Sequence, residues 1–147
     1  MMGRSLAAAC VSLVIVATVP EPTAAAGAIP VRVRIIKGAR QGPPAVDPRL
    51  ADVASQLGRT AYQRWDEVGQ HQVEMSSGKP VQMSLPDGAM LELTLVEARK
   101  DNVTFDVRVA AHHTHSRLTI SKSKRIVHQV TDEKNGEAYF VTVKPWP

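Results

Sequence analysis

The residues best suited to chemistry are the histidines of AAHHTHSR (residues 110–117), a segment that holds three of the five histidines in the chain. Neutral imidazole is a common ligand of Zn²⁺ and Cu²⁺, and such sites use three or four ligands. Alternate residues of an extended chain point the same way, so His113 and His115 could hold one ion together. The segment therefore raises the hypothesis of a Zn or Cu site formed by His112, His113 and His115.

The ligands needed to complete such a site are hard to find. His128 is the best-placed third ligand, but its strand pattern points it into the apolar face, where we expect a core histidine with one ring nitrogen hydrogen-bonded. No carboxylate lies beside the cluster, and the nearest in sequence are Asp106 and Asp132. We therefore favour the alternative, an exposed polar turn that binds divalent ions weakly.

The sequence gives little support for catalysis. No glycine-rich loop that would cradle a phosphate is present. None of the candidate serine nucleophiles lies in a GxSxG elbow. These serines are Ser76, Ser77, Ser84, Ser116, Ser121 and Ser123. We expect a protein that is not an enzyme and carries no cofactor, apart from the Zn or Cu ion of the metal hypothesis.

The first 26 residues have the composition of a secretory signal peptide. Arg4 gives a positive start, residues 6–19 form an uncharged apolar run, and residues 24–26 supply the small side chains that a signal peptidase requires. The apolar run is about 14 residues long, whereas a bilayer-spanning helix needs roughly 20. We therefore expect a periplasmic or secreted protein, cleaved near Ala26 or Ala28, with no transmembrane segment in the mature chain.

The composition of residues 27–147 narrows the classes of site. Cys10 is the one cysteine, and its loss with the signal peptide would exclude disulfides, zinc–thiolate sites, iron–sulfur clusters and thiol nucleophiles from the mature chain. Cleavage removes one basic and one acidic residue, Arg4 and Glu21, so the net charge stays at +4. The remaining length is enough for a single domain with its own core.

The excess positive charge is compatible with weak polyanion binding. Aromatic residues are few and are not interleaved with basic ones, which argues against a specific nucleic-acid site. We expect the partner to be another envelope or extracellular protein, or a second copy of the chain. The candidate contacts are the basic residues Arg32, Arg34, Lys122, Lys124 and Arg125.

The order of elements follows from the hydrophobic pattern. Residues 31–37 alternate apolar and basic, which predicts a half-buried strand with Arg32 and Arg34 facing outward. Asp47 and Pro48 are a good N-cap and first residue for a helix, and Gly58 is suited to a left-handed cap at its end. The predicted helix has an apolar stripe, which we expect to pack on a sheet. The stripe consists of Leu50, Val53, Ala54 and Leu57.

Two hairpins follow, and each has a predicted register. Pairing residues 91–95 with residues 103–109 so that Glu92 lies opposite Arg108 places opposite charges together and Leu93 opposite Val107. Asn135-Gly136 is a strong signal for a two-residue turn. Continued without a break from that turn, the register pairs Lys134 with Glu137, Val130 with Val141 and His128 with Val143.

These patterns predict a mainly β fold. Many short strands without βαβ alternation favour an antiparallel β-sandwich or a small open barrel, here with seven or eight strands and one short helix at about residues 48–57. The pattern between Arg64 and Glu74 is too thin to set the limits of that strand. We predict an exported, non-catalytic domain that acts by binding or assembly, with a metal-binding protein as the alternative.

Overall fold

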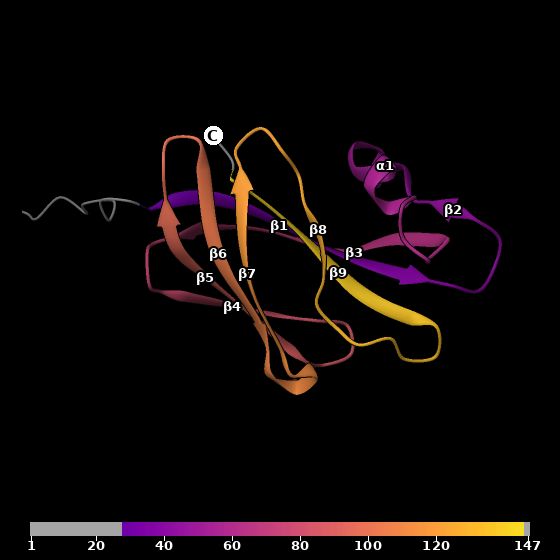
Figure 1. Ribbon diagram of the computed structural model, residues 1–147. Helices are drawn as coiled ribbons and strands as arrows, with labels where there is room; N and C mark the ends of the chain where they lie inside the picture. The colour runs from indigo at the N-terminus through magenta and orange to yellow at the C-terminus, as the bar shows by residue number, and fades with distance from the viewer. Residues whose placement is uncertain (1–27, 146–147) are drawn as a thin grey trace, which may run out of the picture.

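The computed structural model describes residues 28–145, which form nine strands in two sheets (Figure 1). The predicted signal peptide, residues 1–26, lies outside the described residues. One sheet has the order β2-β3-β1-β9-β8, with bounds Ala45–Val46, Arg64–Met75, Ile29–Ala39, Glu137–Pro145 and Val127–Gln129. The other has the order β4-β5-β6-β7, with bounds Pro80–Ser84, Met90–Ala98, Asn102–Val109 and Thr114–Ser121. Within residues 28–145, no helix is long and apolar enough to span a bilayer.

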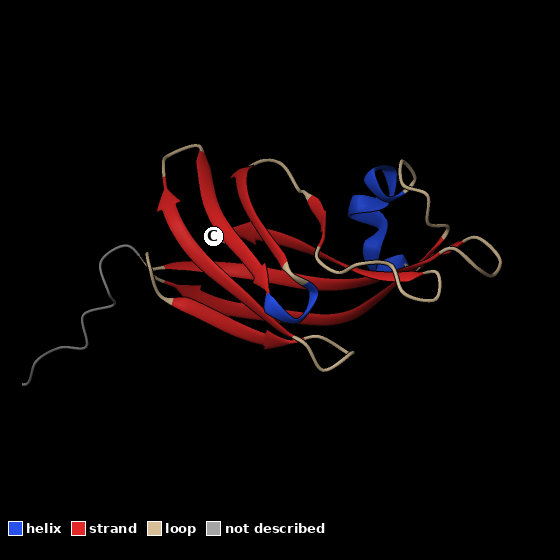
Figure 2. Cartoon of the chain, turned by 60° about the horizontal axis from the view of Figure 1, so that its bottom comes forward, coloured by secondary structure: helices blue, strands red, loops and turns tan. Residues whose placement is uncertain are grey.

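The two sheets pack face to face, which confirms the predicted mainly β, sandwich-like architecture (Figure 2). Val31, Val33 and Ile35 of β1 are buried against the apolar faces of β5 and β6. The predicted register of the β5–β6 hairpin is confirmed, since Glu92 pairs with Arg108 and Leu93 with Val107. Alternation of apolar and polar residues was therefore sufficient to identify the main core.

The helical segment packs on the outer face of the five-stranded sheet. It begins with a 3₁₀ helix, η1 (Pro48–Val53), and ends with a single α turn, α1 (Ala54–Leu57). The predicted short helix at about residues 48–57 is therefore confirmed, and most of it has 3₁₀ geometry. The stripe residues Leu50, Val53 and Leu57 are buried and form a second core with Trp65 and other residues. That core also includes Ile36, Tyr62, Ala138 and Phe140.

The predicted left-handed cap at Gly58 is wrong. Gly58 has φ −64°, a right-handed conformation that any residue can adopt, and its amide donates to the Ala54 carbonyl. The N-terminal part of the prediction is confirmed, because the Asp47 side chain accepts from the Arg49 amide and Pro48 opens the first turn.

A β-bulge in β3 decides which residues meet the helix. From Met75 to Gly69, odd-numbered residues of β3 pair with odd-numbered residues of β1, and the register then shifts by one so that Glu67 pairs with Ile36. Val68 is the extra residue and is 41% exposed. A shift of one residue reverses the faces of a strand. Glu67 and Trp65 therefore lie under the helix, and the irregular pattern from Arg64 to Glu74 has a physical explanation.

The final hairpin corrects the predicted register. Asn135 and Gly136 have φ 55° and 75°, and Lys134 pairs with Glu137, as expected for the two-residue turn. Beyond the turn, however, His128 pairs with Val141 instead of Val143, and the Val130 amide donates to Tyr139, so the Val130–Val141 pair is wrong. The Thr131 hydroxyl accepts from the Tyr139 amide. Asp132 and Glu133 are thus left out of the ladder, which shifts the register by two residues and leaves the faces unchanged.

Two glycines provide a test of the packing between helix and sheet. A Cβ added at Gly38 would lie 2.9 Å from Cζ3 of the buried Trp65 and 3.1 Å from Cε2 of Phe140, so Gly38→Ala should lower the free energy of unfolding by about 1–3 kcal/mol. A Cβ added at Gly58 would lie no closer than 3.6 Å to its nearest neighbour, the Ala54 carbonyl oxygen. Gly58→Ala should therefore raise the free energy of unfolding by about 0.4–1 kcal/mol. Urea denaturation measures both, and a neutral Gly38→Ala would contradict the packing described.

Candidate functional site

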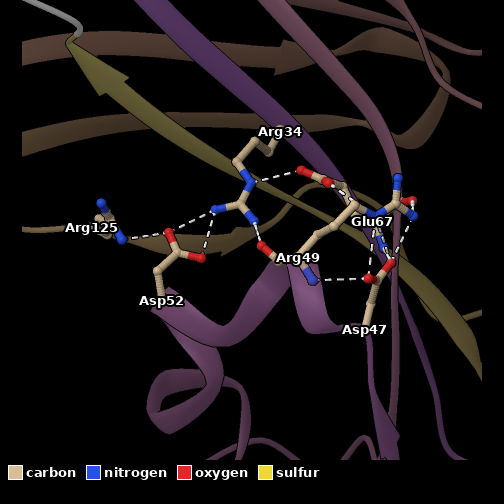
Figure 3. A network of polar contacts seen from close by, with 6 residues as sticks. All are labelled: Arg34, Asp47, Arg49, Asp52, Glu67 and Arg125. Atoms are coloured by element: carbon tan, nitrogen blue, oxygen red, sulfur yellow. Dashed lines mark hydrogen bonds and ion pairs between the residues drawn. The ribbon is translucent and has the colours of Figure 1, made fainter.

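Arg34 lies buried between the sheet and the helical segment, which corrects its predicted role as an exposed contact. Its side chain leaves the outer face of β1, where η1 covers it, and only 8% of the residue is exposed. Nε donates to Glu67 Oε1 at 2.7 Å, Nη1 donates to both Asp52 oxygens, and Nη2 donates to the Arg49 carbonyl (Figure 3). The alternation of β1 was identified correctly, but the prediction assumed that its polar face meets solvent.

The charges around Arg34 balance. Arg49 donates from Nη2 to Asp47 Oδ2 at 2.7 Å and to the Glu67 carbonyl at 3.1 Å, which joins the start of η1 to β3. Asp47 accepts hydrogen bonds from the side chain of Arg49, which has the larger effect, and from the Arg49 amide. Both hold the pKa of Asp47 well below its usual value. Together with Arg125 and Asp52, the network contains three arginines and three carboxylates (Figure 3).

Asp52 links the buried network to the turn between β7 and β8. Its carboxylate accepts hydrogen bonds from Arg34 and from Nη1 of Arg125. Burial acts to raise the pKa of Asp52, but the hydrogen bonds and charge of Arg34, with the charge of Arg125, hold that pKa below its usual value. Gln56 also donates to the Arg125 carbonyl at 2.6 Å. The helix therefore fixes the position of Arg125.

Beside Arg125 is a groove of about 450 Å³ with a strongly basic lining. We call it the basic groove, and its lining residues are Lys122, Lys124, Arg125, Lys144, Asp52, Gln56 and Ser123. Four of these side chains are cationic, and the one carboxylate, Asp52, is already bonded to Arg34 and Arg125. The groove therefore has an excess of positive charge that its own residues do not neutralise.

Three of the five predicted basic contacts line this groove, and a fourth is its neighbour. Lys122, Lys124 and Arg125 belong to it, and Arg32 lines an adjoining hollow with Arg125 and Lys144. Lys144 was missed, although the alternation of residues 140–144 places it on the same face as Phe140 and Thr142. Its location beside the turn depends on the pairing of β9 with β1, where Lys144 lies opposite Arg32, and local sequence does not specify that pairing.

The histidine segment lies at the end of β6, where residues 110–112 form the short 3₁₀ helix η2. Nε2 of His112 is 2.6 Å from Oδ2 of Asp87, a residue of the β4–β5 turn that the sequence did not point to. The order β4-β5-β6-β7 brings this turn and the β6–β7 connection to the same end of the sheet. The order of these strands was the signal that could have indicated that Asp87 lies near His112. Burial acts to raise the pKa of Asp87, but the Ala89 amide and His112 hold it below its usual value.

The other histidines do not join this pair. His113 has φ 53°, in the left-handed region, so the predicted extended run from His113 to His115 is broken, while His115 pairs with Arg108. Residues 28–145 contain no group of three or more His, Cys, Asp or Glu side chains arranged to hold a metal ion. Burial lowers the pKa of His128, and its Nε2 makes no hydrogen bond in this part of the chain, so the expected bond is not made at that nitrogen.

Comparisons with protein families, with curated proteins and with solved structures find no significant match to this chain. The candidate site is therefore defined by its own geometry and charge, and of the arrangements described it is the basic groove that gathers the most unneutralised charge.

Acid titration tests the Asp52 network. Because the folded pKa of Asp52 is below its unfolded value of about 3.9, its ionised form stabilises the fold above that pH, and this stabilisation is lost as the pH falls through the folded value. Asp52→Asn should therefore be less stable than the unchanged protein near neutral pH, and the difference should narrow below about pH 4. Urea denaturation across this pH range measures the difference in free energy of unfolding between the two proteins. A difference that does not depend on pH would contradict the network. Ser55→Ala, on an exposed position of the same helix, is the control that removes no titratable group.

Proposed function

We propose that this chain is an exported, non-catalytic domain that binds an acidic polymer of the cell envelope or the extracellular space. The observation that carries the proposal is the basic groove, in which three lysines gather beside Arg125 while the one lining carboxylate, Asp52, is already bonded to Arg34 and Arg125. Ion pairs with an anionic ligand would supply the negative charge that the groove lacks. Export is inferred from the predicted signal peptide and is part of the same proposal.

A binding role is also supported by the surroundings of the His112–Asp87 pair. Carboxylate–histidine pairs serve hydrolases when the ring also contacts a nucleophile. Among residues 28–145, the His112 ring makes its hydrogen bond to Asp87, and the neighbouring Thr114 hydroxyl donates to the His112 carbonyl and not to the ring. The pair instead links the β4–β5 turn to the β6–β7 connection.

Two earlier hypotheses stay predictions. A Zn or Cu site at His112, His113 and His115 would need ligands beyond those that the described residues bring together. A protein partner, or self-association of the chain, would use a surface that the groove does not identify.

Charge-removing variants test the basic groove. Lys122→Gln with Lys144→Gln should weaken binding to heparin, used as a model polyanion, and lower the slope of log affinity against log salt by about one per lysine. The matched control is Lys79→Gln with Lys134→Gln, which makes the same change of charge at two exposed positions outside the groove.

Affinity is measured by titration at several salt concentrations. The proposal expects the groove variant to bind more weakly than the control variant at every salt concentration where binding is seen. Equal losses in both variants would indicate a general effect of net charge and would overturn the proposal. The absence of heparin binding at low salt would overturn it as well.

A further inference from the structure

A second hollow, mainly apolar, adjoins the basic groove at the end of the sandwich. This end cleft has a volume of about 360 Å³, which is within the range of small-molecule sites. Its lining residues are Ile29, Pro30, Ala98, Val103, Lys122, Lys144 and Pro145. Figure 1 shows the start of β1, the β5–β6 connection and the end of the described chain at the same end of the molecule, away from α1.

The backbone of β5 explains why this end of the core is open. The pairing of β5 with β6 shifts by one residue after Leu95, and the extra residue, Val96, is 37% exposed. The shift turns Ala98 to the inner side opposite Val103. A small side chain thus stands where the rest of β5 places leucines, and the space that it leaves is part of the end cleft.

Two prolines keep the walls of the cleft apolar. Pro30 lies near the start of β1 and Pro145 at the end of β9, where strands leave the ladder and free amides would otherwise need water. Proline has no amide hydrogen to satisfy, so both positions expose ring carbons without an unpaired donor. An apolar group can therefore enter the cleft without burying an unpaired backbone donor at these two positions.

Lys122 and Lys144 belong to both hollows. The methylene chain of a lysine can cover an apolar wall while its ammonium group stays in a polar region. We propose that the end cleft and the basic groove together bind a free single-chain amphiphile, with its acyl chain in the cleft and its anionic head beside Lys122 and Lys144. This inference rests on the anion-binding role proposed for the basic groove and adds a second class of anionic ligand to it.

The geometry favours a free amphiphile over a membrane surface. The cleft volume corresponds to about a dozen water molecules at their liquid volume, enough for most of a short acyl chain. Docking to a bilayer would require large apolar side chains that project from the rim. The exposed large apolar residues of the described chain are Val46, Val68, Met90 and Val96, and none of them lines the cleft.

Binding of decanoate, measured by calorimetry below its micelle concentration, tests this inference. Decanoate should bind with a defined stoichiometry, and decanol, which has the same chain without the charge, should bind more weakly. Ala98→Trp fills the cleft and should weaken decanoate binding at least about tenfold, because the loss of a few buried methylene contacts is enough for that change. Ala98→Met is a milder filling that should give an intermediate loss.

The controls separate the cleft from the groove. Ala111→Trp places the same side chain at an exposed position beside the histidines and should leave decanoate binding unchanged. Ala98→Trp should keep its affinity for heparin, whereas Lys122→Gln with Lys144→Gln should lose affinity for both ligands.

Each outcome decides one of the two proposals. Heparin binding without decanoate binding would overturn the amphiphile site and leave the proposed function intact. Decanoate binding that depends on Ala98 and both lysines, without heparin binding, would support the amphiphile site and overturn the polymer proposal. Equal affinity for decanoate and decanol, equal effects of the two tryptophans, or binding only to vesicles of anionic phospholipid would each overturn the inference.

Discussion

The buried guanidinium of Arg34 is the constraint to which the outer layer of this domain is adapted. A cation under a helix requires carboxylates at fixed positions, since an unpaired buried charge is strongly unfavourable. Glu67 can meet Arg34 from the neighbouring strand because the bulge at Val68 turns it to that face, and Asp52 meets it from the helix. Strand register, helix position and bulge are therefore interdependent.

The helix in turn sets the shape of the basic groove. Arg125 belongs to the β7–β8 turn, yet its position is determined by Asp52 and Gln56 of the helical segment. Lys144 reaches the same place from β9 through pairing with β1. Residues distant in sequence thus form one surface because two separate sets of interactions, a ladder and an ion network, converge there. A neutral core in place of the Arg34 network would leave the turn without this anchor.

The sequence was sufficient for features that depend on local patterns. Alternation identified the buried faces of β1, β5 and β6, and charge pairing selected the right register for β5 and β6. Features that depend on distant pairing were missed. Arg34 could not be recognised as buried without knowing that a helix covers it, and Lys144 and Asp87 enter their sites only through sheet order. The final hairpin failed because a good turn signal does not reveal residues omitted from the ladder next to it.

The two kinds of ladder irregularity in this chain have different consequences for sequence divergence. A single extra residue, as at Val68 or Val96, exchanges the buried and exposed faces in the rest of its strand. Gaining or losing such a residue would therefore require the apolar and polar positions of the rest of the strand to be exchanged by further substitutions. The pair Asp132 and Glu133 preserves the faces on both sides. Length variation among descendants of this sequence should therefore be tolerated beside the last turn in steps of two, and be strongly selected against at the two valines.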